Sequence, residues 1–177
     1  MLIIRKAKKT EFESIVAFYY KLIDDMQGLE YKPMWKKGIY PSLKMLREEL
    51  DAGHIYIGIM SLDADEIVAC LIANHSCNES YNEIEWPTKA EASEVTVIHA
   101  LGVAVDHAGQ GIAQKMCKHV IEECRAAGQK AIRLDVLTGN KPAEALYPKC
   151  GFKSVKKLSM YYEDTGWTNF ELFELSL

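Results

Sequence analysis

The sequence predicts one α/β domain, spanning 1–177, in which helices cover a mixed β-sheet. A length of 177 residues suits one domain, and 49% hydrophobic residues are enough to fill one core. Strand-like and helix-like apolar periods alternate along the chain in the order strand, two helices, three strands, helix, strand, helix, two strands. No repeat and no Pro-rich or Gly/Ser-rich linker divides the chain.

The first elements are marked by helix-start and helix-stop signals. An apolar run over 2–5 predicts a short strand. Thr10 and Glu13 match the T-x-x-E capping box, and apolar side chains recur at helical spacing behind them. We therefore expect a helix that starts at Thr10 and stops at Gly28. A second, shorter helix is expected from about 42 to 53.

A hairpin, a long loop and the clearest strand come next. Two β-branched runs, 54–60 and 67–73, flank a polar turn at 63–65, which is the pattern of a β-hairpin. Residues 76–93 lack apolar periodicity and predict a loop, and loops of that length are commonly functional or mobile. The run 95–105 is apolar almost throughout and predicts a buried strand.

The C-terminal part alternates helices and strands. Apolar residues spaced i, i+4 from Ile112 to Cys124 predict a helix that ends at Gly128. The remaining expected elements are a strand over 130–137, a helix over 141–149, and closing strands over 152–162 and 169–175 around a turn at 163–166.

Charge and cysteine content exclude several classes of function. The 21 basic and 25 acidic side chains give a formal charge of -4, so we expect no nucleic-acid partner. The N-terminus becomes charged at Arg5, and no apolar stretch approaches the ~20 residues of a membrane span. We therefore expect a soluble, cytoplasmic protein with no membrane partner. The 5 cysteines include no C-x-x-C pair, so we expect no metal.

The junction between the clearest strand and the next helix carries the main functional signal. Gly109 and Gly111 accept positive φ and let a ligand approach the backbone. The start of the helix near Ile112 offers unpaired N–H groups, which suit a phosphate. The turn matches neither a Walker A loop nor G-x-G-x-x-G, and an ordinary tight strand-to-helix connection explains it equally well.

Two motifs resemble those of the GNAT superfamily of N-acetyltransferases. Leu101-Gly102-Val103 followed by Ala108-Gly109-Gln110-Gly111-Ile112-Ala113 is similar to the family's Leu-x-Val and Arg/Gln-Gly-x-Gly-Ile-Gly/Ala. The stretch from Asn140 to Phe152 is similar to Asn-x-x-Ala-x-x-Leu/Phe-Tyr-x-Lys-x-Gly-Phe. The resemblance implies an α/β (α+β) fold with a mixed, mainly antiparallel twisted sheet of about seven strands flanked by about four helices. It also implies acetyl transfer from acetyl-CoA to an amine.

The resemblance assigns the acetyl-CoA site to the first motif. The backbone amides of residues 108–113 would hold the pyrophosphate. The strand end at Leu101, Gly102 and Val103 would pair with the pantetheine arm and polarise the thioester carbonyl. Ala108 departs from the family's Arg or Gln, so we expect one contact to the phosphates to be lost and binding to be weaker.

The second motif supplies further cofactor contacts and a general acid. By the resemblance, Asn140 and Ala143 lie at cofactor-contacting positions, although Asn140 could equally serve only as a helix N-cap. Tyr147 matches the residue that protonates the departing thiolate. A phenol of pKa ~10 is a weaker acid than a thiol of pKa ~8.5, so we expect at least a hydrogen-bond donor there. A packing ring on a short helix is the alternative for Tyr147.

The motifs leave the general base open. An amine of pKa ~10.4 is almost fully protonated at neutral pH and must lose a proton before it attacks. His99 shares a strand with Leu101 and Val103, and alternate residues share a face, so we expect these three side chains to point the same way. Glu94, near the start of the strand, is the other candidate. A structural core histidine is the alternative for His99.

We expect the acceptor site in the connecting segments. Aromatic rings there can hold an amine by stacking or cation–π contact, and they can equally pack loops onto the core or form a dimer face. The substrate-binding candidates are Trp35, Tyr40, Asn74, Tyr81 and Trp86. The expected partner is a primary amine of a small molecule or peptide, and a homodimer is common in the family.

Three functions therefore compete. The first is acetyl transfer by direct attack in a ternary complex, because no cysteine occupies a catalytic position of either motif. The second is a non-catalytic acyl-CoA-binding module, which Ala108 and the unassigned base would also fit. The third is an unrelated phosphate- or nucleotide-binding domain.

Overall fold

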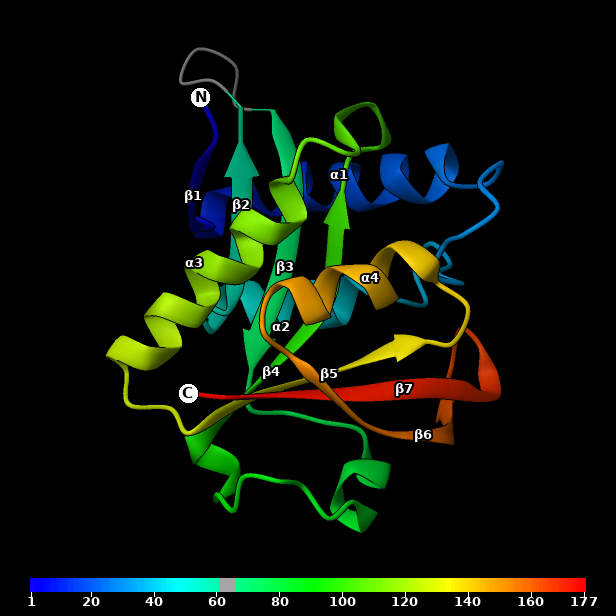
Figure 1. Cartoon of the computed structure of the whole chain (residues 1–177). Coiled ribbons are helices and arrows are strands. Elements are labelled where there is room, and N and C mark those ends of the chain that lie inside the picture. Colours follow the sequence, from blue (N-terminus) through cyan, green and yellow to red (C-terminus); the bar gives the residue numbers. More distant parts are fainter. Residues whose placement is uncertain (61–65) are drawn as a thin grey trace.

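The computed structural model, which describes residues 1–60 and 66–177, contains one seven-stranded sheet with helices on both faces (Figure 1). The strands run in the spatial order β1-β2-β3-β4-β5-β7-β6; β4 and β5 pair in parallel and the other described neighbours antiparallel. The bounds are β1 (Ile3–Lys6), β2 (Ile55–Ile59), β3 (Ile67–Asn74), β4 (Val95–Val103), β5 (Ala131–Leu137), β6 (Lys153–Tyr162) and β7 (Gly166–Ser176). The predicted mixed, mainly antiparallel sheet is confirmed.

The described residues form four α-helices that flank the sheet, the number predicted, and two of them lie on each face (Figure 1). They are α1 (Phe12–Asp25), α2 (Leu43–Asp51), α3 (Ile112–Ala126) and α4 (Lys141–Lys149). One hydrophobic cluster joins α1 and α2 to the sheet, and another joins α3 and α4 to its opposite face. Among the described residues, no helix has both the length and the hydropathy that a membrane span requires.

The predicted start of the first helix is wrong. Lys9–Glu11 forms a 3-10 turn, and α1 begins at Phe12 rather than at a Thr10 cap. Glu11 accepts the backbone N–H of Lys8 at 2.6 Å and pairs with Arg5 of β1 at 2.6 Å. This ion pair ties the turn to the sheet, a tertiary contact that the local T-x-x-E pattern does not contain. The hairpin turn predicted at 63–65 lies outside the described residues.

A β-bulge interrupts β4 at Ala100. His99 is opposite Ile72 of β3, and Gly102 is opposite Cys70. Between these two pairs β4 therefore contains one residue more than β3, which is the definition of a bulge. Ala100 has a φ of +49°, which is uncommon for a residue with a Cβ. The strand also ends at Val103, two residues before the predicted end.

The bulge reverses the expected facing of one side chain. Leu101 and Val103 pack against the cluster under α3, whereas His99 contacts Asn74, whose amide reaches α2 on the other face. The prediction that His99, Leu101 and Val103 point the same way is therefore wrong. The hydroxyl of Tyr19 on α1 donates to the carbonyl of Ala100 at 2.8 Å and holds the bulge in place.

From Ile98 onward, β4 and β5 diverge (Figure 1). Their pairing covers only Val95–Val97 against Ala131–Arg133. Within the described ranges 1–60 and 66–177, the edge of β4 that faces β5 therefore has no strand partner from Ile98 onward. Such an edge offers backbone N–H and C=O groups to an extended ligand.

The loop predicted over 76–93 packs its aromatic side chains against the core. It contains a 3-10 turn, Glu79–Glu83, and its rings Tyr81 and Trp86 are buried. The Trp86 indole N–H donates to the carbonyl of Tyr81 at 2.9 Å, and the guanidinium of Arg133 lies 4.3 Å from the Trp86 ring centre. Of the two predicted roles for these rings, the structure supports packing onto the core.

A buried ion pair anchors this loop, and its loss should destabilise the fold. Arg133 Nε pairs with Glu174 at 2.9 Å, with side chains 12% and 2% exposed, and Glu174 also accepts the N–H of Thr88. Removing one partner leaves an uncompensated buried charge, so we expect Glu174→Gln to lower the free energy of unfolding by about 3 kcal/mol in urea titrations. Glu85→Gln, which breaks an exposed pair with Lys89, should leave the midpoint unchanged. Equal midpoints for both variants would contradict this.

Candidate active site

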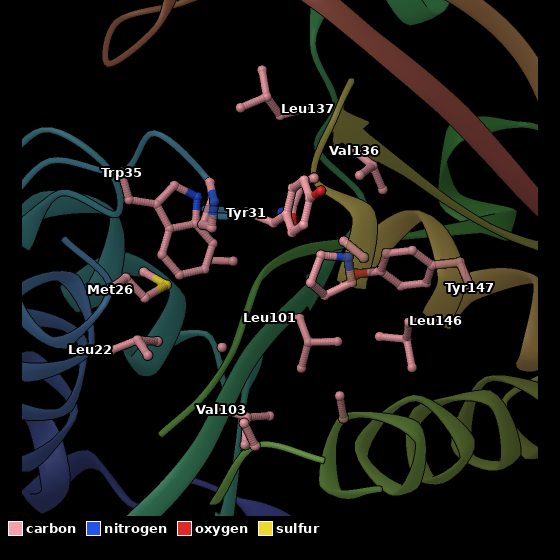
Figure 2. Close-up of a pocket in the computed structure, with 18 of the residues that line it drawn as sticks. Leu22, Met26, Tyr31, Trp35, Leu101, Val103, Val136, Leu137, Leu146 and Tyr147 are labelled. Carbon is pink, nitrogen blue, oxygen red and sulfur yellow. The ribbon is translucent and has the colours of Figure 1, made fainter. Parts of the chain in front are cut away.

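A cavity of about 550 Å³ lies where β4 and β5 diverge. Figure 2 shows side chains of α1 and the segment after it on one side, β5 and α4 on the other, and the end of β4 between them. The labelled lining residues are Leu22, Met26, Tyr31, Trp35, Leu101, Val103, Val136, Leu137, Leu146 and Tyr147. The cavity thus joins both sequence motifs to the first connecting segment.

The glycine turn forms one end of this cavity. Gly109 and Gly111 have φ of +76° and +72°, the left-handed region that favours glycine, and Gly111 is the N-cap of α3. The first turn of α3 therefore presents its unpaired N–H groups beside the cavity. Of the six predicted loop residues, all but Gln110 line it: Ala108, Gly109, Gly111, Ile112 and Ala113. Gln110 is exposed, and Ala108 has no side-chain donor for an anion.

The end of β4 forms the floor. Leu101, Gly102 and Val103 all line the cavity, at the strand edge that β5 leaves open. A Cβ on Gly102 would lie 2.4 Å from Cδ2 of Leu22 on α1. Glycine is thus needed here for the close approach of a helix side chain, on the face opposite the one where Leu101 packs.

Tyr147 of α4 points into the cavity (Figure 2). Its ring is 7% exposed and packs against Phe152 and Phe173, with centroids 5.6 and 6.0 Å away. The hydroxyl has no hydrogen-bond partner among the described residues, so it is free to donate to a ligand. Burial raises the pKa of Tyr147 well above its ordinary value, which keeps the phenol protonated.

The other two residues of the second motif also line the cavity. Asn140 is the N-cap of α4, but its side chain makes no capping hydrogen bond. The alternative that Asn140 acts only as a helix cap is therefore not supported. Ala143 lies one residue beyond the proline in the first turn of α4.

His99 lines the cavity, and its ring orientation is fixed by a hydrogen-bonded chain. Its Nε2 lies 3.0 Å from both Asn74 Oδ1 and the carbonyl of Ser76. Asn74 Oδ1 is an acceptor because it also receives the Ser76 N–H, while Asn74 Nδ2 donates to Glu49 at 2.9 Å. Two acceptors at Nε2 assign its proton there and leave the lone pair of neutral His99 on Nδ1. Burial lowers the pKa of His99, and the charge of Asp135 opposes this shift.

Asp135 on β5 is the central charge of the cavity, and sequence reasoning missed it. The hydroxyls of Tyr81 and Tyr162 both donate to its Oδ2 at 2.8 Å. Burial raises the pKa of Asp135. Its charge in turn acts on the pKa of His99 and of Tyr147. Asp135 alternates with apolar residues along β5, and no motif in the sequence marks it.

The remaining predicted residues divide between the cavity and other places. Trp35 and Tyr40 line the cavity, whereas Asn74 lies behind His99, and Tyr81 and Trp86 lie in the packed loop. Asn74, Tyr81 and Trp86 therefore do not line the cavity.

Glu94 lies away from the cavity, at the opposite end of β4 from Gly102. It pairs with Lys130 at 2.8 Å and accepts the Glu91 N–H. The hydrogen bond from Lys130 lowers the pKa of Glu94, which makes this carboxylate a weaker base. The placement of Glu94 in the site as a general base is therefore wrong.

A family model identifies this arrangement. The model of the acetyltransferase (GNAT) family matches residues 19–152. The chain belongs to the GNAT family. The predicted membership is thus confirmed, and the alternative of an unrelated nucleotide-binding domain does not hold. No curated protein sequence matches the chain.

Solved GNAT structures share the fold over the full length. A putative acetyltransferase from Staphylococcus aureus Mu50 is 22% identical with a TM-score of 0.69, and each chain is covered to 98%. Arabidopsis thaliana NAA60 in complex with acetyl-CoA is 17% identical with a TM-score of 0.72, and both chains are covered to 100%. Ribosomal-protein-alanine N-acetyltransferase from Brucella melitensis is 16% identical with a TM-score of 0.68 and 99% coverage of both. At these identities the likeness establishes the fold alone.

Several residues of this GNAT cavity carry no motif signal. Besides Asp135, they include His107, whose Nδ1 is buried without a hydrogen-bond partner among the described residues, and Tyr162 and Asp164 near the β6–β7 turn. These residues come from separate elements and meet only in the fold. Asp164 stands out only by its burial, and burial cannot be read from the sequence of a polar turn.

Proposed function

We propose that this GNAT protein transfers the acetyl group of acetyl-CoA to a primary amine by direct attack in a ternary complex. The observation that carries the proposal is one continuous cavity that joins the glycine turn, the open edge of β4, the free hydroxyl of Tyr147 and His99. The likeness to the NAA60 structure in complex with acetyl-CoA supports the choice of donor.

The glycine turn and the β4 edge would bind the donor. The amides at the start of α3 are suited to the pyrophosphate, because they combine free N–H groups with the positive end of the helix dipole. The unpaired edge of β4 is suited to the amide groups of the pantetheine arm. A backbone N–H at this edge would also stabilise negative charge on the thioester oxygen during attack.

His99 and Tyr147 would handle the protons. His99 Nδ1 accepts a proton from the ammonium, and the free amine then forms the new C–N bond to the acetyl carbon. The C–S bond breaks, the nitrogen gives its second proton to the departing sulfur, directly or through water, and Tyr147 donates a hydrogen bond to that sulfur as it leaves. Because the pKa of the buried phenol is raised, Tyr147 stabilises the thiolate as a donor and keeps its proton.

The alternative is a module that binds acyl-CoA without catalysis. Ala108 favours that alternative, because it lacks the side-chain donor of the family motif. The free hydroxyl of Tyr147 and the lone pair on His99 Nδ1 favour an enzyme, because a pure binding module needs neither group at the acyl end of its ligand.

Titration of acetyl-CoA by calorimetry tests the donor site. We expect saturable 1:1 binding and at least about tenfold weaker binding by Gly111→Glu, because the new carboxylate repels the phosphates at the helix start. Gly128→Glu is the matched control: it places the same residue at a φ of +74° after α3, away from the cavity. Absence of binding by the wild type, or equal loss in both variants, would contradict the proposal.

A further inference from the structure

The acceptor half of the cavity contains a second buried carboxylate. Asp164, in the turn after β6, is 5% exposed and lines the cavity. Its hydrogen-bond donors are backbone amides, its own and that of Thr165. Burial raises the pKa of Asp164, and the nearby charge of Asp135 raises it further. The two carboxylates therefore belong to one electrostatic site.

No cationic side chain in the described part of the chain is in direct contact with either carboxylate, although the charge of His99 acts on Asp135. Among the described residues, neither Asp135 nor Asp164 forms an ion pair. Arg133, two residues from Asp135 on β5, is engaged by Glu174. Lys36 lowers the pKa of Asp164 only as a more distant charge. Buried carboxylates are stable when a cation pairs with them, and here the open side of both faces the cavity.

The free oxygen of Asp135 can accept a ligand. Tyr81 and Tyr162 both donate to Oδ2, and Oδ1 has no donor among the described residues. An ammonium group in the cavity could therefore donate to Oδ1 without displacing either tyrosine.

Aromatic rings line the wall beside the carboxylates. Trp35 and Tyr40 have ring centres 6.1 Å apart, and Tyr40 and Tyr162 have ring centres 6.4 Å apart. All three line the cavity. Burial raises the pKa of Tyr40, and the charges of Asp135 and Asp164 raise it further, so the ring lies within range of both carboxylates. Ring faces next to carboxylates attract organic cations and bind the methylene chain between charges.

From this arrangement we infer that the acceptor is a small aliphatic amine with a second ammonium group, which Asp164 and Asp135 bind while the first amine reacts at His99. Asp135, which lines the same cavity as His99 and Asp164, would add its charge to the site that binds the second ammonium group. The tyrosine and tryptophan rings would pack against the carbon chain. This inference rests on the proposed function for the identity of the reacting group.

Binding of matched amines tests the inference directly. Calorimetry of the protein with bound CoA would compare three diamines of three, four and five carbons with the monoamines of the same length. We expect at least one diamine to bind about tenfold or more tighter than its monoamine, as one charge-assisted hydrogen bond in a buried site predicts. Asp164→Asn should reduce that ratio to below about twofold.

A neighbouring residue provides the control. Glu163→Gln changes the net charge by the same amount in the same turn, but Glu163 is exposed, so the ratio should stay at the wild-type value. Unchanged acetyl-CoA binding by Asp164→Asn would show that this variant folds. The ratio of kcat/KM for diamine and monoamine should follow the binding ratio.

Each outcome is decisive. Equal binding of every diamine and its monoamine, or a ratio that survives in Asp164→Asn, overturns the inference. Selective diamine binding that Asp164→Asn removes, without any acetyl transfer, supports the cation site and overturns the proposed function instead. Acetyl transfer with no preference for diamines supports the proposed function and overturns the inference of a second ammonium site.

Discussion

His99→Gln is expected to lower kcat by about 10³-fold, in the range for loss of a general base. Glutamine retains an amide N–H that can donate to Asn74 and Ser76, as Nε2 of His99 does, but it has no basic nitrogen at the position of Nδ1. The loss should therefore lie in kcat, with the affinity for acetyl-CoA within about twofold. Steady-state assays of thiol release measure kcat, and calorimetry measures the affinity for acetyl-CoA.

The pH profile separates this role from a structural one. Because burial lowers the pKa of His99, its neutral form persists at a lower pH than for an ordinary histidine. Wild-type kcat/KM should therefore stay constant as pH falls to ~6.5 and decrease only below it. His99→Gln should lack this acid limb. His75→Gln, a change at an exposed histidine outside the cavity, should retain both the limb and the activity. Full activity of His99→Gln would overturn the assignment.

The part of the site proposed to bind acetyl-CoA was predictable because its residues lie in two short stretches of sequence, 101–113 and 140–147. The positive φ of Gly109 and Gly111, the helix start at Ile112 and the position of Tyr147 all follow from local sequence. Helices and strands were predictable for the same reason, since apolar periodicity is a local property. The ends of elements were less predictable: β4 ends at Val103, two residues before the predicted end, and it contains a bulge that a side chain of α1 holds.

The acceptor half was not predictable because it depends on contacts between distant segments. The hydroxyl of Tyr19 holds the bulge at Ala100, and no pattern within β4 shows that contact. The bulge alters which side chains share a face, so the expected grouping of His99 with Leu101 failed. Asp135 and Asp164 looked like ordinary polar residues of a strand and a turn. Their burial beside one another appears only when β5 and the β6–β7 hairpin meet.

Tyr147→Phe should lower kcat by about 10²-fold, which is the usual cost of losing one donor to a developing negative charge. The ring contacts with Phe152 and Phe173 do not involve the hydroxyl, so phenylalanine preserves the packing of α4. We therefore expect an unchanged unfolding midpoint and an affinity for acetyl-CoA within about twofold. Tyr161→Phe removes an exposed hydroxyl outside the cavity and should have no effect on kcat.

The pH dependence of the Tyr147→Phe penalty tests whether the phenol stays protonated during the reaction. If Tyr147 only donates a hydrogen bond to the thiolate, the penalty for Tyr147→Phe stays constant as pH rises towards 9, because the raised pKa keeps the phenol protonated. A penalty that disappears near pH 9 would instead show that the phenol ionises in this range, contrary to its raised pKa. Equal kcat for wild type and Tyr147→Phe with every amine tested would favour the non-catalytic module, because the hydroxyl would then have no role in thiolate departure.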